Sequence, residues 1–295
     1  MPELPDLTVY LERIESLAAG RTLKQLRIAN AFVLRSVAPA PTAFAGRRLL
    51  ATRRIGKRLV LSFDGGLHAV MHLMILGRLR WTKPGAAIPK SSGLLAFDFD
   101  HGSLMLIEHG SKRRASLHLV AGDSALSDFD RGGLEVLSAD PARFGAALRR
   151  ENHTLKRALT DPRVVAGIGN AYSDEILHRA RLSPFRQTQA LAEDEIARLF
   201  DATCAVLGEW TQRLRAETGD GWPEKVTAFR PEMAVHGRYK LPCPDCGAPV
   251  QRIVYADNEA NYCARCQTGG RLLADRALSR LLKANWPKTL DELER

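Results

Sequence analysis

Four cysteines near the C-terminal end constrain the fold of this chain more than any other feature of its sequence. They form two CxxC pairs, Cys243 with Cys246 and Cys263 with Cys266, and 16 residues separate the pairs. This spacing is typical of one structural Zn2+ ion held by four thiolates, with a hairpin between the pairs. Disulfides are the alternative, but the chain starts with acidic residues where an export signal would be basic, so an oxidising compartment is not expected.

Basic residues outnumber acidic ones, 43 to 33, which gives a net charge of +10. A surplus of this size favours a polyanionic partner such as nucleic acid. An anionic membrane surface is the competing explanation, but the sequence has neither a strongly basic amphipathic helix nor an apolar run long enough to span a bilayer. The sequence therefore predicts a soluble cytoplasmic protein without a membrane partner, and its 295 residues suggest two domains with a small appendage.

Hydrophobic periodicity predicts several kinds of structure along the chain. An amphipathic helix is predicted over 6–20, and short β-like runs separated by glycine and proline occupy about 22–122. Such runs are typical of a β-sandwich or a barrel. A helical region follows over about 132–217, and a loop rich in glycine, proline and charge then leads to the cysteine hairpin and a helical tail over 271–286.

A glycine-rich turn stands before one of the predicted helices. Gly167 and Gly169 bracket an apolar residue, and Asn170 follows directly ahead of an amphipathic pattern. Glycines in such a turn let backbone N–H groups approach a phosphate, and the helix N-terminus favours an anion. The same arrangement also occurs in ordinary turns between helices, so the motif alone does not decide the function.

Three motifs follow one another in an order that matches one known family. The chain reads PELPD after its methionine, TDPRVVAGIGNAYSDEILHRARLSP in the helical region, and the four-cysteine ribbon last. They closely resemble the PELPE start, the helix-two-turn-helix and the zinc finger of the formamidopyrimidine-DNA glycosylase and endonuclease VIII family, over roughly residues 2–267. The resemblance implies an α+β fold with an N-terminal β-sandwich and leading helix over 2–125, a helix-two-turn-helix DNA-binding domain over 132–217, a zinc finger over 238–268 and a C-terminal helical extension over 269–295.

The resemblance also implies an activity. It indicates a monomeric, nucleoid-associated DNA glycosylase and AP lyase that excises oxidised, ring-opened or bulky damaged bases from double-stranded DNA and completes β,δ-elimination. Pro2 would be the nucleophile once Met1 is removed, because a free α-amine has a reference pKa of about 8 and is partly neutral at physiological pH. Its secondary amine would form a cationic iminium at C1′ of the damaged nucleotide. Glu3 resembles the family's general acid and base, and Lys57 resembles a lysine that meets a phosphate beside the lesion.

Further residues match positions that contact DNA in the family. Asn170 and Lys156 resemble residues of the helical domain that hold the DNA backbone. Ile75 stands where the family commonly has a methionine that enters the duplex, and Met74 stands where it has a glycine. Such an inserted side chain fills the gap that a flipped nucleotide leaves.

Two further segments depart from the family's pattern. The GSKRRA segment over 110–115 stands in place of a wedge loop that reads DPRRFG, so that Arg114 replaces a phenylalanine and Lys112 replaces an arginine, beside Arg113. An arginine can stack on a base, but it is not an apolar wedge. Asn258 stands where the family offers an arginine to the phosphates, and an amide lacks the charge of that contact. These departures leave the lesion and the opposite base open.

Two other classes of function are compatible with the sequence. One is a relative that binds abasic or distorted DNA with little or no base excision, which the altered wedge and finger favour and the intact Pro2, Glu3 and Lys57 disfavour. The other is a zinc-ribbon RNA-binding protein without catalysis, which leaves the PELPD start unexplained. In the loop before the finger, Trp222 or Phe229 is a candidate to touch a flipped base, with a buried loop anchor as the alternative.

Overall fold

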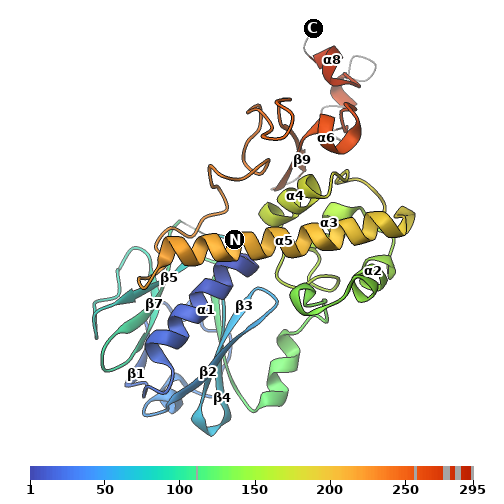
Figure 1. Cartoon of the computed structure of the whole chain (residues 1–295). Helices are drawn as coiled ribbons and strands as arrows, with labels where there is room; N and C mark the ends of the chain where they lie inside the picture. The colour runs from blue at the N-terminus through green and yellow to red at the C-terminus, as the bar shows by residue number, and fades with distance from the viewer. Residues whose placement is uncertain (111, 256–257, 275–279, 283–286, 294–295) are drawn as a thin grey trace. The chain divides into compact units, whose positions relative to one another are not determined.

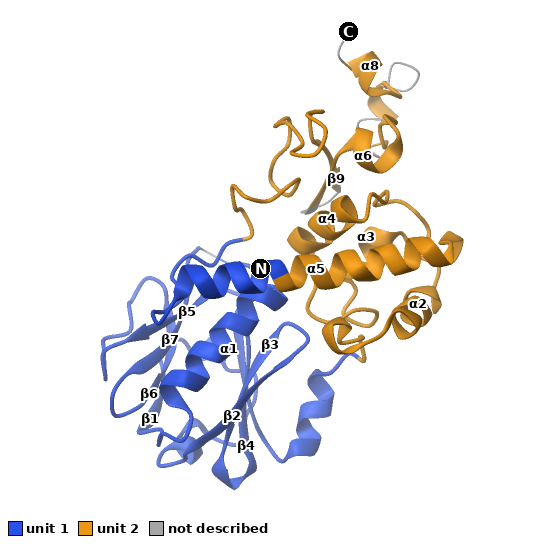
Figure 2. Cartoon of the chain, viewed as in Figure 1, with its two compact units in different colours: residues 1–131, 209–227 blue, residues 132–208, 228–295 orange. Residues whose placement is uncertain are grey.

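The computed structural model describes residues 1–110, 112–255, 258–274, 280–282 and 287–293, the side chains of Tyr255 and Asn258 excepted (Figure 1). These residues form two compact units, Met1–Arg131 with Glu209–Thr227 and Gly132–Gly208 with Ala228–Arg295 (Figure 2). The helix α5 (Glu193–Thr218) contributes its first part to the second unit and its last part to the first. No described helix combines the length and the apolar composition that crossing a bilayer would require.

The first unit begins with helix α1 (Leu4–Ala18), which starts two residues before the predicted position. The N–H of Glu3 donates a hydrogen bond to Asp6 Oδ2 at 3.0 Å, and Pro5 lies in the first turn, where its missing N–H costs nothing. Gly20 ends the segment with a φ of +74°, a left-handed conformation that glycine adopts without strain. The apolar face of α1 is fully buried and consists of Leu7, Tyr10, Ile14 and Ala18.

Two antiparallel four-stranded sheets form the body of the first unit, which confirms the predicted β-sandwich. One sheet has the order β1 (Gln25–Ile28), β6 (Gly93–Asp98), β7 (Ser103–Glu108), β5 (Gly77–Thr82). The other has the order β2 (Leu49–Ile55), β3 (Arg58–Phe63), β4 (Leu67–His72), β8 (Ser116–Ala121). Both sheets contribute to one core with α1, because Leu61 and Phe63 of β3 belong to the same buried cluster as Phe97 of β6 and Leu106 of β7.

Strand β5 is not among the six β-like runs that the sequence pattern indicates within 22–122. Its sequence, GRLRWT, alternates arginine with apolar residues, so its hydrophobic content is lower than that of the neighbouring runs. In the structure Leu79 is buried and Arg80 is exposed, which is the alternation expected of a half-buried strand.

The second unit contains the predicted helices and the cysteine hairpin (Figure 1). Its described helices and strands are α2 (Pro141–Arg149), α3 (Leu155–Thr160), α4 (Asn170–Arg179), the start of α5, β9 (Gln251–Tyr255), β10 (Asn258–Tyr262), α6 (Ala264–Thr268) and α8 (Leu290–Leu293). Short 3-10 helices across the two units lie at Ala31–Val33, Pro41–Phe44, Asp64–Gly66, Asp123–Phe129, Val136–Ser138 and Thr188–Ala190. Residues 275–279 and 283–286 of the predicted helical tail lie outside the described part of the chain.

Candidate functional site

The amino end of the chain is partly enclosed in the first unit and is surrounded by charge. Burial lowers the pKa of the Met1 α-amino group below its ordinary value, and the nearby cations Arg78 and Lys57 lower that pKa further. The carboxylates of Glu3 and Asp6 act in the opposite direction. An amine in such surroundings is neutral, and so able to act as a nucleophile, at a lower pH than a solvated one.

The three residues predicted to be catalytic all belong to this unit. Pro2 is buried directly ahead of Glu3, which is 3% exposed and precedes the first turn of α1. Lys57 lies in the two-residue turn between β2 and β3, where Gly56 has a φ of +57°. The charges of Glu3 and Lys57 both act on the pKa of the terminal amine. The start of the chain and the turn between β2 and β3 therefore lie near the same amino group.

Arg78 is a candidate site residue that the sequence reasoning missed. It lies on β5, its Nε donates to the carbonyl oxygen of Val226 at 2.6 Å, and its Nη1 donates to the carbonyl oxygen of Ile75 at 3.0 Å. These bonds fix a guanidinium whose charge acts on the terminal amine. In the sequence, the alternation of arginine with apolar residues in GRLRWT could have indicated this strand and with it Arg78.

The turn after β4 presents two apolar side chains. Met74 has a φ of +53°, and its N–H donates to His72 Nδ1 at 3.1 Å. Burial, together with nearby cations, lowers the pKa of His72 to about 4, so the ring is neutral and Nδ1 accepts. The turn leaves Ile75 55% exposed and Leu76 44% exposed. Leu76 was not predicted, although a second aliphatic residue beside Ile75 was visible in the sequence.

The segment that replaces the family's wedge loop is organised by a buried carboxylate. Glu108 is 1% exposed at the end of β7, and its Oε2 accepts the N–H groups of Arg114 at 2.8 Å and Ala115 at 2.9 Å. Lys112 and Arg114 are exposed, whereas Arg113 is half-buried and donates to the carbonyl oxygen of Ser91. The loop therefore presents cations in place of an aromatic ring.

The two aromatic candidates of the loop before the finger differ in their surroundings. Trp222 donates its Nε1–H to the carbonyl oxygen of Leu79 at 2.8 Å, and its ring centroid lies 5.6 Å from that of Tyr10. Trp222 is thus a loop anchor, which is the alternative stated above. Phe229 is 69% exposed and stacks on His236, with 5.7 Å between ring centroids.

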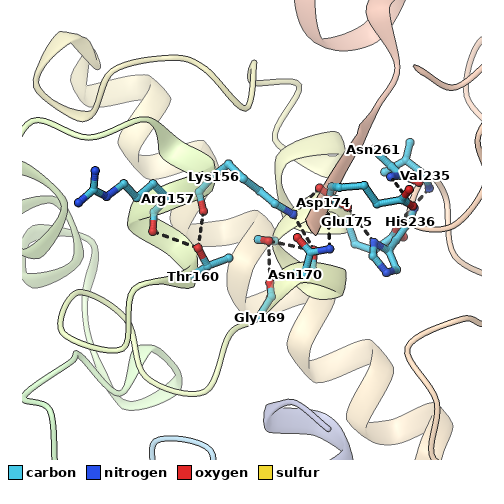
Figure 3. Close-up of polar contacts among 12 residues, drawn as sticks. Lys156, Arg157, Thr160, Gly169, Asn170, Asp174, Glu175, Val235, His236 and Asn261 are labelled. Carbon is cyan, nitrogen blue, oxygen red and sulfur yellow. Dashed lines mark hydrogen bonds and ion pairs between the residues drawn. The ribbon is translucent and has the colours of Figure 1, made fainter. Parts of the chain in front are cut away.

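In the second unit, Lys156 holds the start of helix α4 (Figure 3). The lysine is 3% exposed, and its Nζ lies 2.5 Å from Asp174 Oδ1 and 2.7 Å from the carbonyl oxygen of Asn170. Asn170 is the first residue of α4, and its Nδ2 donates to the carbonyl oxygen of Glu259 on β10 at 2.9 Å. The ammonium of Lys156 is therefore engaged inside the unit, where it fixes the residue that was predicted to bind DNA.

The next turn of α4 holds the loop before the finger (Figure 3). Asp174 Oδ2 lies 2.8 Å from His236 Nδ1, and the Glu175 carboxylate accepts the three consecutive N–H groups of residues 234–236 at 2.7 to 2.9 Å. Glu175 is 6% exposed. A buried carboxylate that accepts several N–H bonds has its hydrogen-bonding capacity satisfied. Helix α4 therefore binds the hairpin through Asn170 and the preceding loop through Glu175.

The four predicted metal ligands converge at the base of the hairpin. Their sulfur atoms all lie within 4.8 Å of one another, with 3.9 Å between those of Cys243 and Cys266 and 3.4 Å between those of Cys246 and Cys263. A Zn–S bond of about 2.3 Å places tetrahedral sulfur neighbours about 3.8 Å apart, so the donor set fits zinc. Burial and the neighbouring thiols raise the pKa of Cys263 to about 11, so a cation is needed to hold this sulfur as a thiolate near neutral pH.

The predicted phosphate contact of the finger involves Asn258. Its backbone pairs with Tyr255 between β10 and β9, and its side chain lies outside the described part of the chain. Strand β9 carries an arginine, Arg252, whose Nη1 lies 3.6 Å from Glu259 Oε2. Its Cζ lies 4.4 Å from the centroid of the Tyr239 ring.

Comparison with known proteins assigns the β-sandwich, the helical region and the cysteine hairpin to the domains of one family. Three family models match the chain: the formamidopyrimidine-DNA glycosylase N-terminal domain over 1–117, the formamidopyrimidine-DNA glycosylase H2TH domain over 135–216, and the zinc finger found in FPG and IleRS over 240–269. Together with the four converging cysteines, the last match identifies the metal as zinc.

Individual relatives cover most of the chain. It is 36% identical over 279 residues to the formamidopyrimidine-DNA glycosylase of Thermus thermophilus, which covers 92% of this chain and 100% of the relative. It is 40% identical over 151 residues to an uncharacterized formamidopyrimidine-DNA glycosylase-like protein of Mycobacterium tuberculosis, covering 51% of this chain and 94% of the relative.

Solved structures share the fold. The MutM (Fpg) protein of Thermus thermophilus has a TM-score of 0.75 at 33% identity, covering 90% of this chain and 98% of that one. The Lactococcus lactis Fpg in complex with abasic-site DNA has a TM-score of 0.79 at 24% identity, covering 90% and 99%. Because three family domains follow one another along the sequence and the Thermus enzyme aligns over its whole length, this chain belongs to the formamidopyrimidine-DNA glycosylase family.

Proposed function

We propose that this chain is a bifunctional DNA glycosylase and AP lyase that excises oxidised, ring-opened or bulky damaged bases from double-stranded DNA. The observation that carries the proposal is the enclosed amino end, with the pKa of its amine lowered and with Glu3, Lys57 and Arg78 around it. Family membership supports the glycosylase half, because the relatives are named for that activity. Solved complexes of the Lactococcus lactis relative contain abasic-site DNA or Fapy-dG DNA, which supports damaged DNA as the partner.

The proposed chemistry starts after removal of Met1, which frees the amine of Pro2. The nitrogen attacks C1′ of the damaged nucleotide, the glycosidic bond breaks, and the base leaves with a proton. The attached nitrogen then loses its proton and the C1′–O4′ bond of the sugar breaks, with a proton taken up by O4′, which leaves a cationic iminium at C1′. The iminium acidifies the C2′ proton, whose removal expels the 3′ phosphate, and a second elimination expels the 5′ phosphate. Glu3 stands one residue from the nucleophile and acts as the general acid and base.

The remaining predicted residues take roles in DNA binding. Lys57 neutralises a phosphate beside the lesion, and Asn170 binds the backbone from the start of α4. Ile75, with its neighbour Leu76, enters the duplex because both side chains are exposed and apolar. We revise the role of Lys156, whose buried ion pair makes it a positioning residue for Asn170.

The loop of Lys112, Arg113 and Arg114 lies against the strand opposite the lesion in this proposal. Arginine stacks on bases and forms two-pronged hydrogen bonds, so the loop reads the opposite base by stacking and polar contact. Asn258 provides a neutral contact to the backbone. The enzyme acts as a monomer in the cytoplasm, close to the nucleoid.

Excision of a ring-opened base tests the proposal. Purified protein is incubated with a duplex that carries one formamidopyrimidine-guanine, and the strand is analysed with and without alkali. Glycosylase and lyase activity together predict cleaved strand without alkali. Glu3→Gln is expected to remove the activity, whereas Glu15→Gln on the exposed side of the same helix is expected to keep it.

A relative that binds DNA without excision is the second candidate. Arg114 in the wedge loop and Asn258 in the finger favour it, because both depart from residues that the family uses to invade and clamp the duplex. Tight binding of abasic-site DNA, with every lesion left uncut by the unmodified protein, would favour this second function.

A further inference from the structure

A histidine outside the cysteine motif reaches one of the zinc ligands. His178 lies in the last turn of α4, is 3% exposed, and places Nε2 3.2 Å from Cys243 Sγ. Cys243 is itself 2% exposed, so solvent does not compete for this contact. A zinc-bound thiolate carries no proton and only accepts hydrogen bonds, so Nε2 must be the donor.

We propose that His178 is a positioning residue of the zinc site, whose Nε2–H bond to the Cys243 thiolate holds that sulfur in place and slows the loss of the metal. A hydrogen bond withdraws charge from the thiolate and makes it less reactive toward protons and electrophiles. Partners of this kind, outside the ligand set, typically change metal affinity by about 10- to 100-fold. The inference concerns the finger alone and holds whether or not the chain excises bases.

The second cysteine pair has a comparable attachment. Gln267 Oε1 accepts the N–H of Cys263 at 2.8 Å, and Gln267 Nε2 donates to the carbonyl oxygen of Leu182 at 2.9 Å. Leu182 follows α4 in the sequence, so the metal site is tied through both of its cysteine pairs to α4 and the segment that follows it. His178 differs from Gln267 because it bonds to a ligand atom, and its loss should therefore act on the metal directly.

The test compares two variants of full-length, zinc-loaded protein. His178→Phe keeps an aromatic ring but removes the donor, and His178→Gln keeps an N–H at a similar reach. Zinc transfer to a chromogenic chelator gives the release rate, and alkylation followed by mass spectrometry identifies which cysteine reacts first. His153→Phe is the matched control, because His153 lies in the same unit and its Nε2 pairs with Glu151 instead of a sulfur.

The proposal predicts about 10- to 100-fold faster zinc release from His178→Phe, with Cys243 alkylated first among the four zinc ligands and a slower release from His178→Gln than from His178→Phe. His153→Phe should release zinc at the unmodified rate. Release from His178→Phe at the unmodified rate would overturn the proposal. So would equal acceleration in the Phe and Gln variants, or alkylation of another zinc ligand before Cys243, because those results indicate a packing role. Failure of base excision in the unmodified protein would overturn the proposed function and leave this inference intact.

Discussion

At the scale of single residues, this chain carries the residues proposed to be catalytic at its amino end and departs from the family's pattern at several positions proposed to meet DNA. Pro2, Glu3 and Lys57 are present, and the structure adds Arg78 to their surroundings. The first three were predicted from the sequence because they match positions of the family's pattern. Arg78 required the fold, since only strand pairing brings β5 into the same unit as the start of α1.

Met74 carries a conformational cost that a glycine would not. Its φ of +53° is left-handed, and this region costs an unbranched residue about 1 kcal/mol. We expect Met74→Gly to raise the free energy of unfolding by about 0.5–1 kcal/mol, measured by urea denaturation. Ile75→Gly in the same turn has no such strain to relieve and should be destabilising. Equal effects of the two substitutions would contradict this account.

The pH dependence of the amine provides a second prediction at this scale. Burial, Arg78 and Lys57 lower the pKa of the terminal amine, and the Pro2 amine should experience the same surroundings. Covalent trapping on abasic DNA should therefore fall, as the pH falls, with a midpoint below about 8. Arg78→Gln removes one cation that disfavours the charged amine, so it should move the midpoint upward. Arg80→Gln, on the exposed face of the same strand, should leave it unchanged, and a downward shift in Arg78→Gln would refute the assignment.

At the scale of elements, the sequence predicted what depends on local pattern. The first helix, the six β-like runs, the helical region and the cysteine hairpin follow from hydrophobic periodicity and from the glycine and proline residues between the elements. The first turn of α1 was missed because it depends on a hydrogen bond from Glu3 to Asp6. Strand β5 was missed because its arginines mask the apolar alternation, and its identity comes from pairing with β7.

The link from α3 to α4 depends on a buried ion pair. Lys156→Met should leave the Asp174 carboxylate without its cation in a buried site, at a cost of about 3 kcal/mol or more. The measurement is the free energy of unfolding of the second unit by denaturant titration. Lys156→Met combined with Asp174→Leu removes both charges and should recover part of that loss. A Lys156→Met variant with unchanged stability and weaker DNA binding would instead support the direct DNA contact first predicted.

The end of β4 should make the first unit sensitive to acid. The pKa of His72 is about 4 in the folded chain against an ordinary 6.5, so between these values the unfolded chain binds more protons. Stability should fall as the pH falls through this window, by on the order of 2 kcal/mol after allowing for partial exposure. Urea midpoints at pH 7 and pH 4.5 measure the loss, which His72→Gln should reduce and His109→Gln, at an exposed site, should not. An unchanged pH dependence in His72→Gln would contradict this reading.

At the scale of the whole molecule, three motifs in order were enough to identify the family and to predict the sandwich and the finger. What the sequence did not predict is the set of contacts inside the second unit. Helix α4 holds the hairpin through Asn170, the preceding loop through Glu175 and a zinc ligand through His178. These bonds join residues far apart in the chain, and polar pairs of this kind leave no periodic signal in a sequence.

The central claim is that the amine of Pro2 attacks DNA. The most direct measurement is borohydride reduction of the zinc-loaded protein mixed with abasic-site duplex, followed by peptide mapping of the product by mass spectrometry. One adduct is expected, on the nitrogen of Pro2, in chains that lack Met1, and no adduct there in any fraction that retains Met1. DNA that binds but forms no adduct, or an adduct mapped to a lysine in place of Pro2, would show that the Pro2 amine is not the nucleophile.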